Sequence, residues 1–428
     1  MLLPIAVLGQ DHFLELKRRF HEKFDKECNK FPFVKKFQAL SQSPNGRYIV
    51  YKFSEDTPRR IDSGWGDKVA GLVHATALAV RFNRTLLIDS CQRNGLYNFF
   101  KPYGLPHSVN SLPAFPHGMR NNTLRCLGND KPDRVTICSM VKGDVPEQVL
   151  EFWGHREYIC RWEHEAVQVM RENLGVQASD DLNQVAGCLN RLAMWPTRHL
   201  WTLTQQLYSE NTKKLPAAAQ GTTNTANSHS LLKARAPGEK QVDSNSAEVM
   251  QIGVHVRCGQ NSDYKDQPQC LSGPNISKET KSRGGPLEMA KLTAAVLEQT
   301  RQLVTHHPLV LLSADDTAVA NQMADYLRAQ GIHNIWIPDK GCQIDFDSSY
   351  ACLQVTVLGW FALSLSDRLV VQRVAAGLNY PPSGFSRSAA SYGFTLPRPR
   401  AAFHVYGQPG NTSVSSIDSR VQQMNWFC

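Results

Sequence analysis

The sequence lacks the short motifs by which several kinds of site are usually found. No CxxC pair occurs, which disfavours a zinc ribbon or a thioredoxin-like centre. HExxH, GxSxG and His-rich clusters are also absent, so no metal site is predicted. The Gly-rich stretch GWGDK at 64–68 has neither the GK[ST] ending of a Walker loop nor the GxGxxG spacing of a dinucleotide fingerprint.

Long apolar and long basic runs are missing too. The apolar N-terminal run is broken by Gln10 and Asp11, is too short to span a membrane and has no basic leader. We therefore expect a soluble chain, or one whose anchor lies outside this sequence. The net charge of +9 is spread along the chain. It favours an anionic partner, but solvated lysines explain most of it and no nucleic-acid arm is predicted.

Cysteine, by contrast, is plentiful. The chain has 11 cysteines, a high number for a cytosolic enzyme and one compatible with several disulfides. The odd count leaves at least one thiol unpaired in a monomer, and the spacing leaves the pairing open. Four N-x-S/T triplets, at residues 83, 121, 275 and 411, add weak support for a secretory route.

The length of 428 residues suits two domains, each with its own core. We expect a polar, partly helical lead-in at 1–46 and a first Rossmann-like domain at 47–208. A flexible linker or insert, rich in small polar residues, is predicted at 209–248, and a second Rossmann-like domain at 249–428.

Both halves show strands alternating with helices. In the first, strands at 47–53 and 86–89 flank a helix of about four turns, a further strand is a candidate at 134–141, and helices are expected from 147 to about 208. In the second, strands are predicted at 251–257, 308–314, 334–337 and 368–372. Helices are predicted at 286–303, 317–330 and 350–365, with a short one after the turn at 380–385. This alternation predicts an α/β fold with parallel sheets.

Polar residues occur where the strands of the second half end. His255 and Arg257 share one face of the first strand, because strand side chains alternate, and Asp315 and Asp316 follow the second strand. Ligands of open α/β sheets bind beyond these carboxyl ends. Each feature alone also fits a purely structural role, as a core histidine, a surface ion pair or a helix cap. Their common placement favours a ligand site.

The turn after the last strand contains Ser383, Gly384, Phe385 and Ser386. A serine can cap the following helix, whose free N–H groups attract an anion, and the glycine allows close approach. Arginine provides a planar charged fork for phosphate oxygens. The combination suits a nucleotide diphosphate held between Arg257 and a helix N-terminus.

Taken in order, these segments resemble the α1,2/α1,6/protein-O-fucosyltransferase superfamily. GWGDKVAGLVHATALAVRFNRTLLID is similar to its Gly-rich turn and first helix. GVHVRCG, VLLSADD and SDRLVV with SGFSRSAA are similar to its three later signatures. The matching segments lie within 48–105 and 251–392, close to half of the chain.

The resemblance implies a GT-B-like fold, two Rossmann-like domains whose parallel sheets face a cleft, and GDP-fucose as the donor substrate. It implies inversion at the anomeric carbon and no metal or other cofactor. By position, Arg257 would bind the diphosphate and stabilise the leaving group, and His255 would lie near the nucleotide. Asp315 and Asp316 would contact the nucleoside, and Ser383 to Ser386 the phosphates.

The Gly-rich turn of Gly64, Gly66, Asp67 and Lys68 would face the reacting centre, with Asp67 as the candidate general base. The chain departs from the family at two positions. Gln260 stands where an acidic residue usually follows the first signature, and Asp263 is a possible substitute. Gly359 stands where relatives carry an acidic residue that contacts guanine, which leaves guanine selectivity open.

Three functions follow from these observations. The first is a fucosyltransferase of the secretory pathway, in the Golgi by analogy, acting on a glycan, polysaccharide or protein hydroxyl. The second is a GT-B transferase that uses another nucleotide sugar, which Gly359 would permit. The third is a catalytically silent, lectin-like or scaffolding relative. No nucleic-acid partner and no membrane anchor are predicted from this chain.

Overall fold

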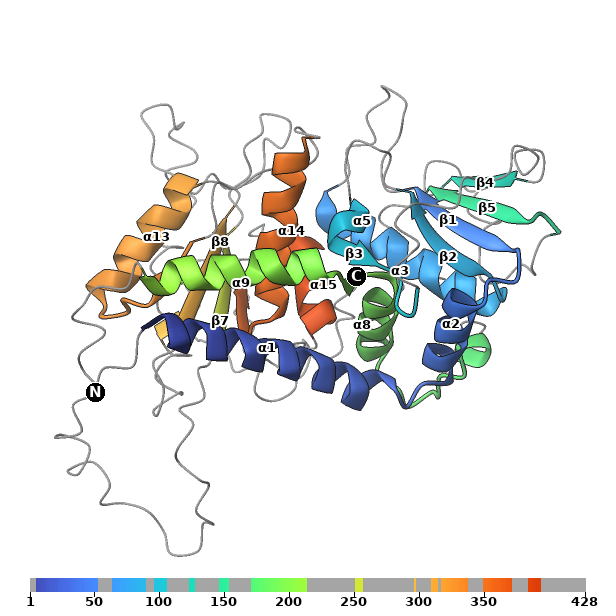
Figure 1. The fold of residues 1–428 in the computed structure, drawn as a ribbon, viewed down its shortest axis with the longest axis horizontal. Coiled ribbons are helices and arrows are strands. Elements are labelled where there is room, and N and C mark those ends of the chain that lie inside the picture. The colour runs from blue at the N-terminus through green and yellow to red at the C-terminus, as the bar shows by residue number, and fades with distance from the viewer. Residues whose placement is uncertain are drawn as a thin grey trace, which may run out of the picture.

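The computed structural model describes twelve stretches of the chain. They are residues 5–52, 64–89, 96–105, 123–127, 146–153, 171–213, 251–256, 296–297, 309–314, 317–337, 349–371 and 384–393. Two parallel sheets stand apart in this structure, with helices packed between and beside them (Figure 1).

The first sheet has the strand order β2-β1-β5-β4, and every pairing in it is parallel. Its strands are β1 (Tyr48–Lys52), β2 (Thr85–Asp89), β4 (Thr123–Leu127) and β5 (Val149–Trp153). Helix α3 (Trp65–Arg81) connects β1 to β2, so the predicted strand–helix–strand unit is confirmed. The helix ends at Phe82, where Asn83 takes the left-handed conformation (φ 53°) that turns the chain into β2.

The second sheet has the order β10-β7-β8-β9 and is also parallel. Its strands are β7 (Gln251–Val256), β8 (Leu309–Ala314), β9 (Ile335–Trp336) and β10 (Arg368–Val371). All four lie within a residue or two of the predicted positions. The expected α/β class with two Rossmann-like halves is therefore confirmed by the topology of the described residues.

Most of the larger helices pack together between and beside the sheets: α8 (Leu182–Ala193), α9 (Arg198–Lys213), α14 (Tyr350–Ser364) and α15 (Gly384–Gly393). Helix α13 (Thr317–Ala329) lies on the outer face of the second sheet (Figure 1). A short segment of α5 (Leu96–Phe99), β3 (Phe100–Lys101) and β6 (Trp195–Pro196) completes the first half. Helix α14 is apolar on all sides because it contacts α9, α15, β7 and β8.

The N-terminal residues are more than a polar lead-in. Residues 5–42 form α1 (Ile5–Cys28) and α2 (Pro32–Gln42), and α1 packs against α8 and α9 (Figure 1). Phe13, Phe20 and Phe24 lie on one side of α1 and are almost fully buried. Their spacing of seven and four residues is that of a helix face that packs on a core.

Other predictions needed correction. Val149–Trp153 is strand β5 rather than helix, since it pairs with β1 on one side and β4 on the other. The predicted linker at 209–248 begins too early, because α9 continues to Lys213. The strand predicted at 134–141 lies outside the described residues, as does the helix at 286–303 except for 296–297.

The two halves do not have fully separate cores. One apolar cluster runs from α1, α3 and α8 through α14 and α15 to Leu311 and Trp336 of the second sheet. A second cluster covers the other face of that sheet, against α13. Trp65 of α3 meets Trp360 of α14 edge to face, with ring centroids 5.5 Å apart. The segment boundaries at 46, 208 and 248 stay predictions.

A buried network joins α9, α14 and β7. The hydroxyl of Tyr208 donates to the side-chain carbonyl of Gln251, whose amide nitrogen donates to the carbonyl of Ala362 and to the Ser366 hydroxyl, each at 2.9 Å. Every polar atom of this buried glutamine side chain is thus satisfied, as burial requires.

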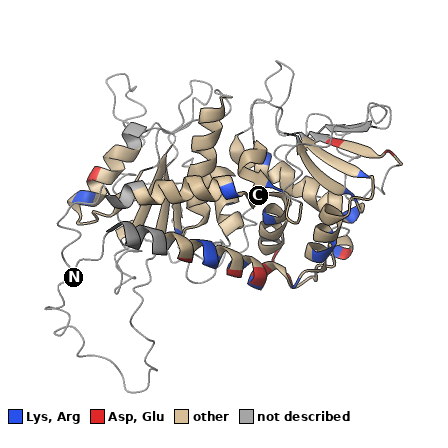
Figure 2. Ribbon diagram, viewed as in Figure 1, with Lys and Arg blue, Asp and Glu red and all other residues tan. Residues whose placement is uncertain are grey.

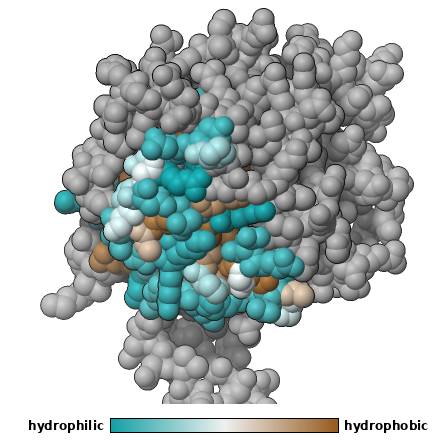
Figure 3. Space-filling view, turned by 90° about the vertical axis from the view of Figure 1, so that its right-hand side faces the viewer, coloured by the Kyte–Doolittle hydropathy of each residue, from teal (hydrophilic) through white to brown (hydrophobic). Residues whose placement is uncertain are grey.

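The surface of the described residues is mixed in charge and polarity. Lys and Arg are spread over several helices and strands (Figure 2), as the sequence predicts. The face formed by the first sheet and α2 is mostly hydrophilic, with small hydrophobic areas (Figure 3). None of the described helices combines the length and apolarity that a membrane span requires.

A buried disulfide joins α1 to α8, between Cys28 and Cys188, which are 160 residues apart in sequence. Cys352 is disulfide-bonded as well. Because the first bond closes a long loop, it reduces the entropy of the unfolded chain and fixes the end of α1.

We expect the Cys28→Ala/Cys188→Ala double variant to be destabilised by about 2–5 kcal/mol. Each single variant should lose a similar amount, because either change removes the same bond. Thermal unfolding monitored by circular dichroism checks both. An unchanged melting temperature in the double variant would contradict a structural role for the bond.

Candidate functional site

The Gly-rich turn forms the first turn of α3. Gly64 is the N-cap in an extended conformation, and its carbonyl accepts from the amides of Asp67 (3.0 Å) and Lys68 (3.2 Å). The hydroxyl of Tyr51 in β1 donates to the carbonyl of Lys68 at 2.7 Å. The turn is therefore fixed to the central strand of the first sheet. The side chains of Asp67 and Lys68 are partly exposed.

His255, near the carboxyl end of β7, reaches the first turn of α15. Its Nδ1 lies 2.6 Å from the hydroxyl oxygen of Ser386, and its ring stacks on Phe385 with centroids 5.0 Å apart. His255 and Ser386 are both buried. The two predicted segments GVHVRCG and SGFS thus meet, although they are 131 residues apart.

The starts of α3 and α15 touch through their glycines. A Cβ atom on Gly66 would lie 2.0 Å from the carbonyl carbon of Gly384 and 2.5 Å from the amide nitrogen of Phe385. No side chain fits at these distances, so Gly66 is required by a backbone-to-backbone contact between the halves. The Gly-rich turn, the end of β7 and the start of α15 therefore lie together.

Two helix N-termini consequently meet at one place. The free N–H groups and the aligned peptide dipoles of each helix favour negative charge within the first turn. Helix α3 has 17 residues and α15 has 10, long enough for this effect. Their junction is suited to an anionic group such as a phosphate.

Helix α15 is positioned by its buried surroundings. All residues from Ser386 to Gly393 are buried, against α3, α8 and α14. The indole nitrogen of Trp360 donates to the Ser388 hydroxyl at 2.9 Å. A Cβ on Gly393 would lie 2.1 Å from the carbonyl oxygen of Ser364, so this end also packs backbone to backbone.

Four predicted residues lie outside the described part of the chain: Arg257, Asp315, Asp316 and Ser383. Gln260 and Asp263 lie outside it as well. Arg257 follows β7 directly and Asp315 follows β8, and these strands are paired in parallel up to Val256 and Ala314. The carboxyl ends of these two strands therefore lie at the same edge of the sheet, where His255 is.

The sequence did not single out the residues that support this site. Tyr51 donates a hydrogen bond to the first turn of α3, and Trp360 donates one to Ser388 of α15. Both read in the sequence as ordinary aromatic residues of a strand and an apolar helix. A useful signal was available for Trp360, because an indole inside an apolar helix needs a partner for its N–H.

Within the described residues, no three His, Cys, Asp or Glu side chains come together as a metal ion would need. Gly359 lies on α14 with its Cα facing β8. A Cβ there would be 3.6 Å from the Ser313 hydroxyl oxygen, an ordinary contact distance. The position is thus buried but not crowded.

No protein family matches the sequence, and no curated protein matches it either. Several solved structures are similar to the chain at low identity. A mutant of Arabidopsis thaliana FUT1 in complex with GDP is 15% identical, over 94% of this chain and 80% of that one, with a TM-score of 0.45.

The fucosyltransferase NodZ from Bradyrhizobium is 15% identical, over 85% of this chain and 97% of its own, with a TM-score of 0.40. NodZ alpha-1,6-fucosyltransferase soaked with GDP-fucose is 16% identical, over 81% and 92%, with a TM-score of 0.36. All three TM-scores are below 0.5, and all three identities are below 25%.

We expect Gly66→Ala to force the starts of α3 and α15 apart. Overpacking of this kind costs about 1–3 kcal/mol, because neither backbone can move alone. Gly359→Ala is the matched control, since it also changes a buried helical glycine but meets only the Ser313 hydroxyl. It should be neutral, or more stable by about 0.5–1 kcal/mol. Denaturant unfolding measures both, and equal stabilities would rule out the contact.

Proposed function

We propose that the protein is an inverting, metal-independent glycosyltransferase that moves fucose from GDP-fucose to a hydroxyl group of a glycan, polysaccharide or protein. The observation that carries the proposal is the meeting of Gly66, His255 and the start of α15. Three segments chosen from the sequence alone, by their residues and by the family resemblance, come from distant parts of the chain. Their convergence is not required by a fold of two parallel sheets.

The donor's diphosphate would be bound where the helix N-termini meet. Arg257 would contribute a fixed positive charge from the end of β7, and the amides at the start of α15 would donate to phosphate oxygens. His255, oriented by Ser386 and Phe385, would lie beside the nucleotide. Asp315 and Asp316, after β8, would accept hydrogen bonds from the nucleoside.

Transfer would take place in one displacement. The acceptor oxygen forms a bond to the anomeric carbon as the bond to the β-phosphate oxygen breaks, and GDP departs with that electron pair. Charge grows on the β-phosphate as this happens, so Arg257 and the helix amides stabilise the transition state more than the bound donor. Asp67 would take the acceptor's proton, because it lies one residue from the contact between α3 and α15.

Guanine selectivity is the weakest part of the donor site. Gly359 provides no carboxylate to bind a nucleobase. A Cβ atom at this position would meet only the Ser313 hydroxyl within 4 Å. This observation favours a second candidate function, transfer from another nucleotide sugar by the same machinery. A silent, lectin-like or scaffolding relative is the third possibility.

The secretory pathway is the proposed location. The disulfide between Cys28 and Cys188 and the bonded state of Cys352 support it, since such bonds form in oxidising compartments. The Golgi is proposed by analogy with the family that the sequence resembles. The acceptor is proposed only as a hydroxyl-bearing glycan, polysaccharide or protein.

Calorimetric titration without metal, with GDP, GDP-fucose, GDP-mannose and UDP, tests the donor site. We expect GDP and GDP-fucose to bind, and Arg257→Ala to weaken binding and to lower transfer by about 100- to 1,000-fold. Arg18→Ala is the matched control, because it removes the same charge from the exposed face of α1. Preference for UDP would support the second function, and binding of none of the four would support the silent relative.

The Asp67→Asn variant tests the proposal that Asp67 is the general base. Loss of a general base lowers the rate by about 100- to 10,000-fold, whereas the amide leaves the shape of the turn unchanged. We therefore expect GDP binding to persist while transfer is lost. If both are lost together, Asp67 has a structural role in the α3 turn. If transfer continues at the original rate, another group accepts the proton.

A further inference from the structure

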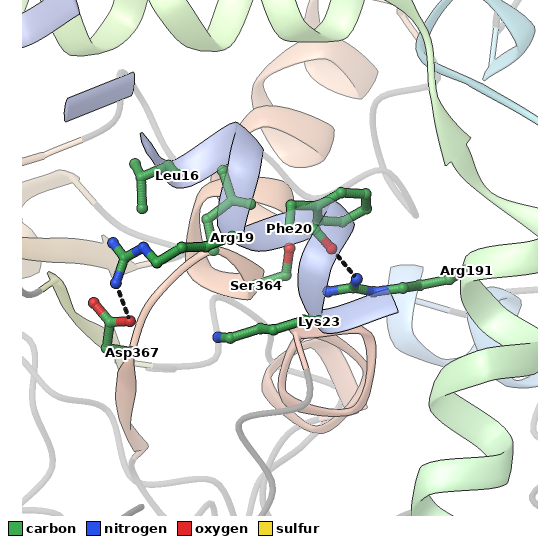
Figure 4. Close-up of a pocket in the computed structure, with 8 residues that line it drawn as sticks. Leu16, Arg19, Phe20, Lys23, Arg191, Ser364 and Asp367 are labelled. Atoms are coloured by element: carbon green, nitrogen blue, oxygen red, sulfur yellow. Dashed lines mark hydrogen bonds and ion pairs between the residues drawn. The ribbon is translucent and has the colours of Figure 1, made fainter. Parts of the chain in front are cut away.

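A cavity beneath α1 is too small to hold a substrate (Figure 4). The space open to a water-sized molecule there is about 10 Å³, which is room for one water. Its lining contains ion pairs, since Arg19 contacts both Asp367 (2.8 Å) and Glu15 (3.7 Å). Burial lowers the pKa of Lys23 to about 8 and that of Arg191 to about 9. This cavity belongs to the packing of α1, so a sugar-sized ligand would have to bind elsewhere.

Three aromatic side chains meet at the surface where α5, α9 and α14 come together. Tyr350, the first residue of α14, stacks on Phe99 of α5, with ring centroids 5.6 Å apart and planes inclined by 21°. His199, in the first turn of α9, also packs on Phe99, with centroids 5.7 Å apart. Phe99 is fully buried, whereas Tyr350 is 37% exposed and His199 is exposed as well. We call these three residues the aromatic platform.

The backbone around the aromatic platform is fixed. The amide of Thr197 donates to the carbonyl of Phe99 at 2.9 Å and its hydroxyl donates to the carbonyl of Asn98, so α5 is tied to the start of α9. Ser349 caps α14 and accepts from the amide of Cys352 at 3.1 Å. Cys352 is disulfide-bonded, which restrains the same turn. A surface that is already ordered loses little entropy when a ligand binds to it.

The aromatic platform is on the same side of the second sheet as the candidate donor site. Helix α14 carries the chain from the carboxyl end of β9 to the amino end of β10, and Figure 1 shows its start next to α5. Gly359 of this helix lies beside Ser313, near the carboxyl end of β8. Tyr350 precedes Gly359 by more than two helical turns, which places it about 13 Å further along the axis, beyond the end of the strand.

Aromatic contacts connect the platform to the place where the two helix N-termini meet. Phe100, which follows Phe99, packs against Trp65 with ring centroids 6.5 Å apart. Trp65 is the first residue of α3 and precedes Gly66, whose contact with Gly384 defines that meeting point. An acceptor bound on the platform would therefore lie beside the donor, where its hydroxyl must be for transfer.

The aromatic platform has polar edges without strong charge. Among the described residues, neither the Tyr350 hydroxyl nor the His199 ring has a hydrogen-bond partner. The first turns of α5, α9 and α14 contain no acidic residue. A ring face with hydrogen-bonding groups at its rim fits a pyranose, which has an apolar face of C–H groups and a rim of hydroxyls. The surface thus matches a neutral sugar better than a basic peptide.

We propose that the aromatic platform binds a pyranose ring of a neutral glycan, and that this glycan is the acceptor. The inference rests on the proposed function and narrows its acceptor to a carbohydrate chain. The sugar would stack on the face of the Tyr350 ring that Phe99 does not cover. Its hydroxyls would form hydrogen bonds with the Tyr350 hydroxyl and the His199 ring. Both residues would determine acceptor specificity without taking part in a chemical step.

Binding of the fluorescently labelled protein to two printed arrays tests the acceptor class. One array carries neutral oligosaccharides that end in glucose, galactose, mannose or N-acetylglucosamine, and the other carries peptides that contain serine and threonine. With GDP present, we expect saturable binding to at least one group of these glycans and none to the peptides. Binding to the peptides alone, or to neither array, would overturn the inference.

The Tyr350→Ala variant tests the platform itself. Loss of the stacked ring should weaken glycan binding and raise the KM for that glycan about tenfold, while kcat and the affinity for GDP stay unchanged. Tyr350→Phe keeps the ring and should retain most of the binding. Tyr326→Ala is the matched control, because Tyr326 is 41% exposed on α13, the helix on the outer face of the second sheet. Equal glycan binding by Tyr350→Ala and the unaltered chain would refute the role of the platform.

The acceptor proposal and the proposed function fail in different ways. If Tyr350→Ala does not fold, His199→Ala on the exposed first turn of α9 provides a second test, and it should also weaken glycan binding while GDP still binds. Glycan binding that depends on Tyr350, in a chain that binds neither GDP nor GDP-fucose, would refute transfer and keep the platform. Transfer of labelled fucose to the peptides alone would refute the platform and keep the proposed function.

Discussion

The contact between Gly66 and Gly384 is the constraint on which the rest of the molecule depends. Two helices from different halves begin within van der Waals distance of each other, and only the absence of side chains permits it. Trp65, the residue before Gly66, packs edge to face on Trp360, and Ser386, two residues after Gly384, lies within hydrogen-bond distance of His255.

Helix α15 belongs to the second half in sequence but packs among helices of the first. It is buried along its length, and its carbonyl at Tyr392 accepts from Arg191 while its tyrosine hydroxyl donates to Met194. Among the described elements, α1, α9 and α15 each contact both halves. Such an arrangement couples the two sheets more tightly than a single hinge would, and it favours a site whose two sides keep their relative position.

Much of this fold could be predicted from periodicity. The strand at 251–256 is a run of buried residues that ends in a polar pair, and α14 is an apolar run bounded by Ser349 and Asp367, so both were found nearly to the residue. Val149–Trp153 was missed because five residues with one glutamate fit a helix as well as a strand, and only pairing with β1 and β4 decides between them. The order of the motifs along the sequence predicted that the Gly-rich turn, the end of β7 and the start of α15 would lie together.

Other features had no local signal at all. The partner of Cys28 could not be known, since eleven cysteines allow many pairings. The role of Gly66 was visible as a Gly-rich turn, but its contact with Gly384 depends on how two halves dock. Arg191 and Lys23 look like ordinary helix cations in sequence. Burial is a property of the assembled core, and it alone makes their charges unusual.

The hydrogen bond from Tyr208 to Gln251 holds two points of the chain, 43 residues apart in sequence, close together in space. It fixes Tyr208, in the last part of α9, beside Gln251, the first residue of β7. A segment between two such anchors need not cover any distance. Doubling its length adds only about 0.6 kcal/mol of closure entropy. This is where the protein could accommodate foreign sequence while both sheets stay intact.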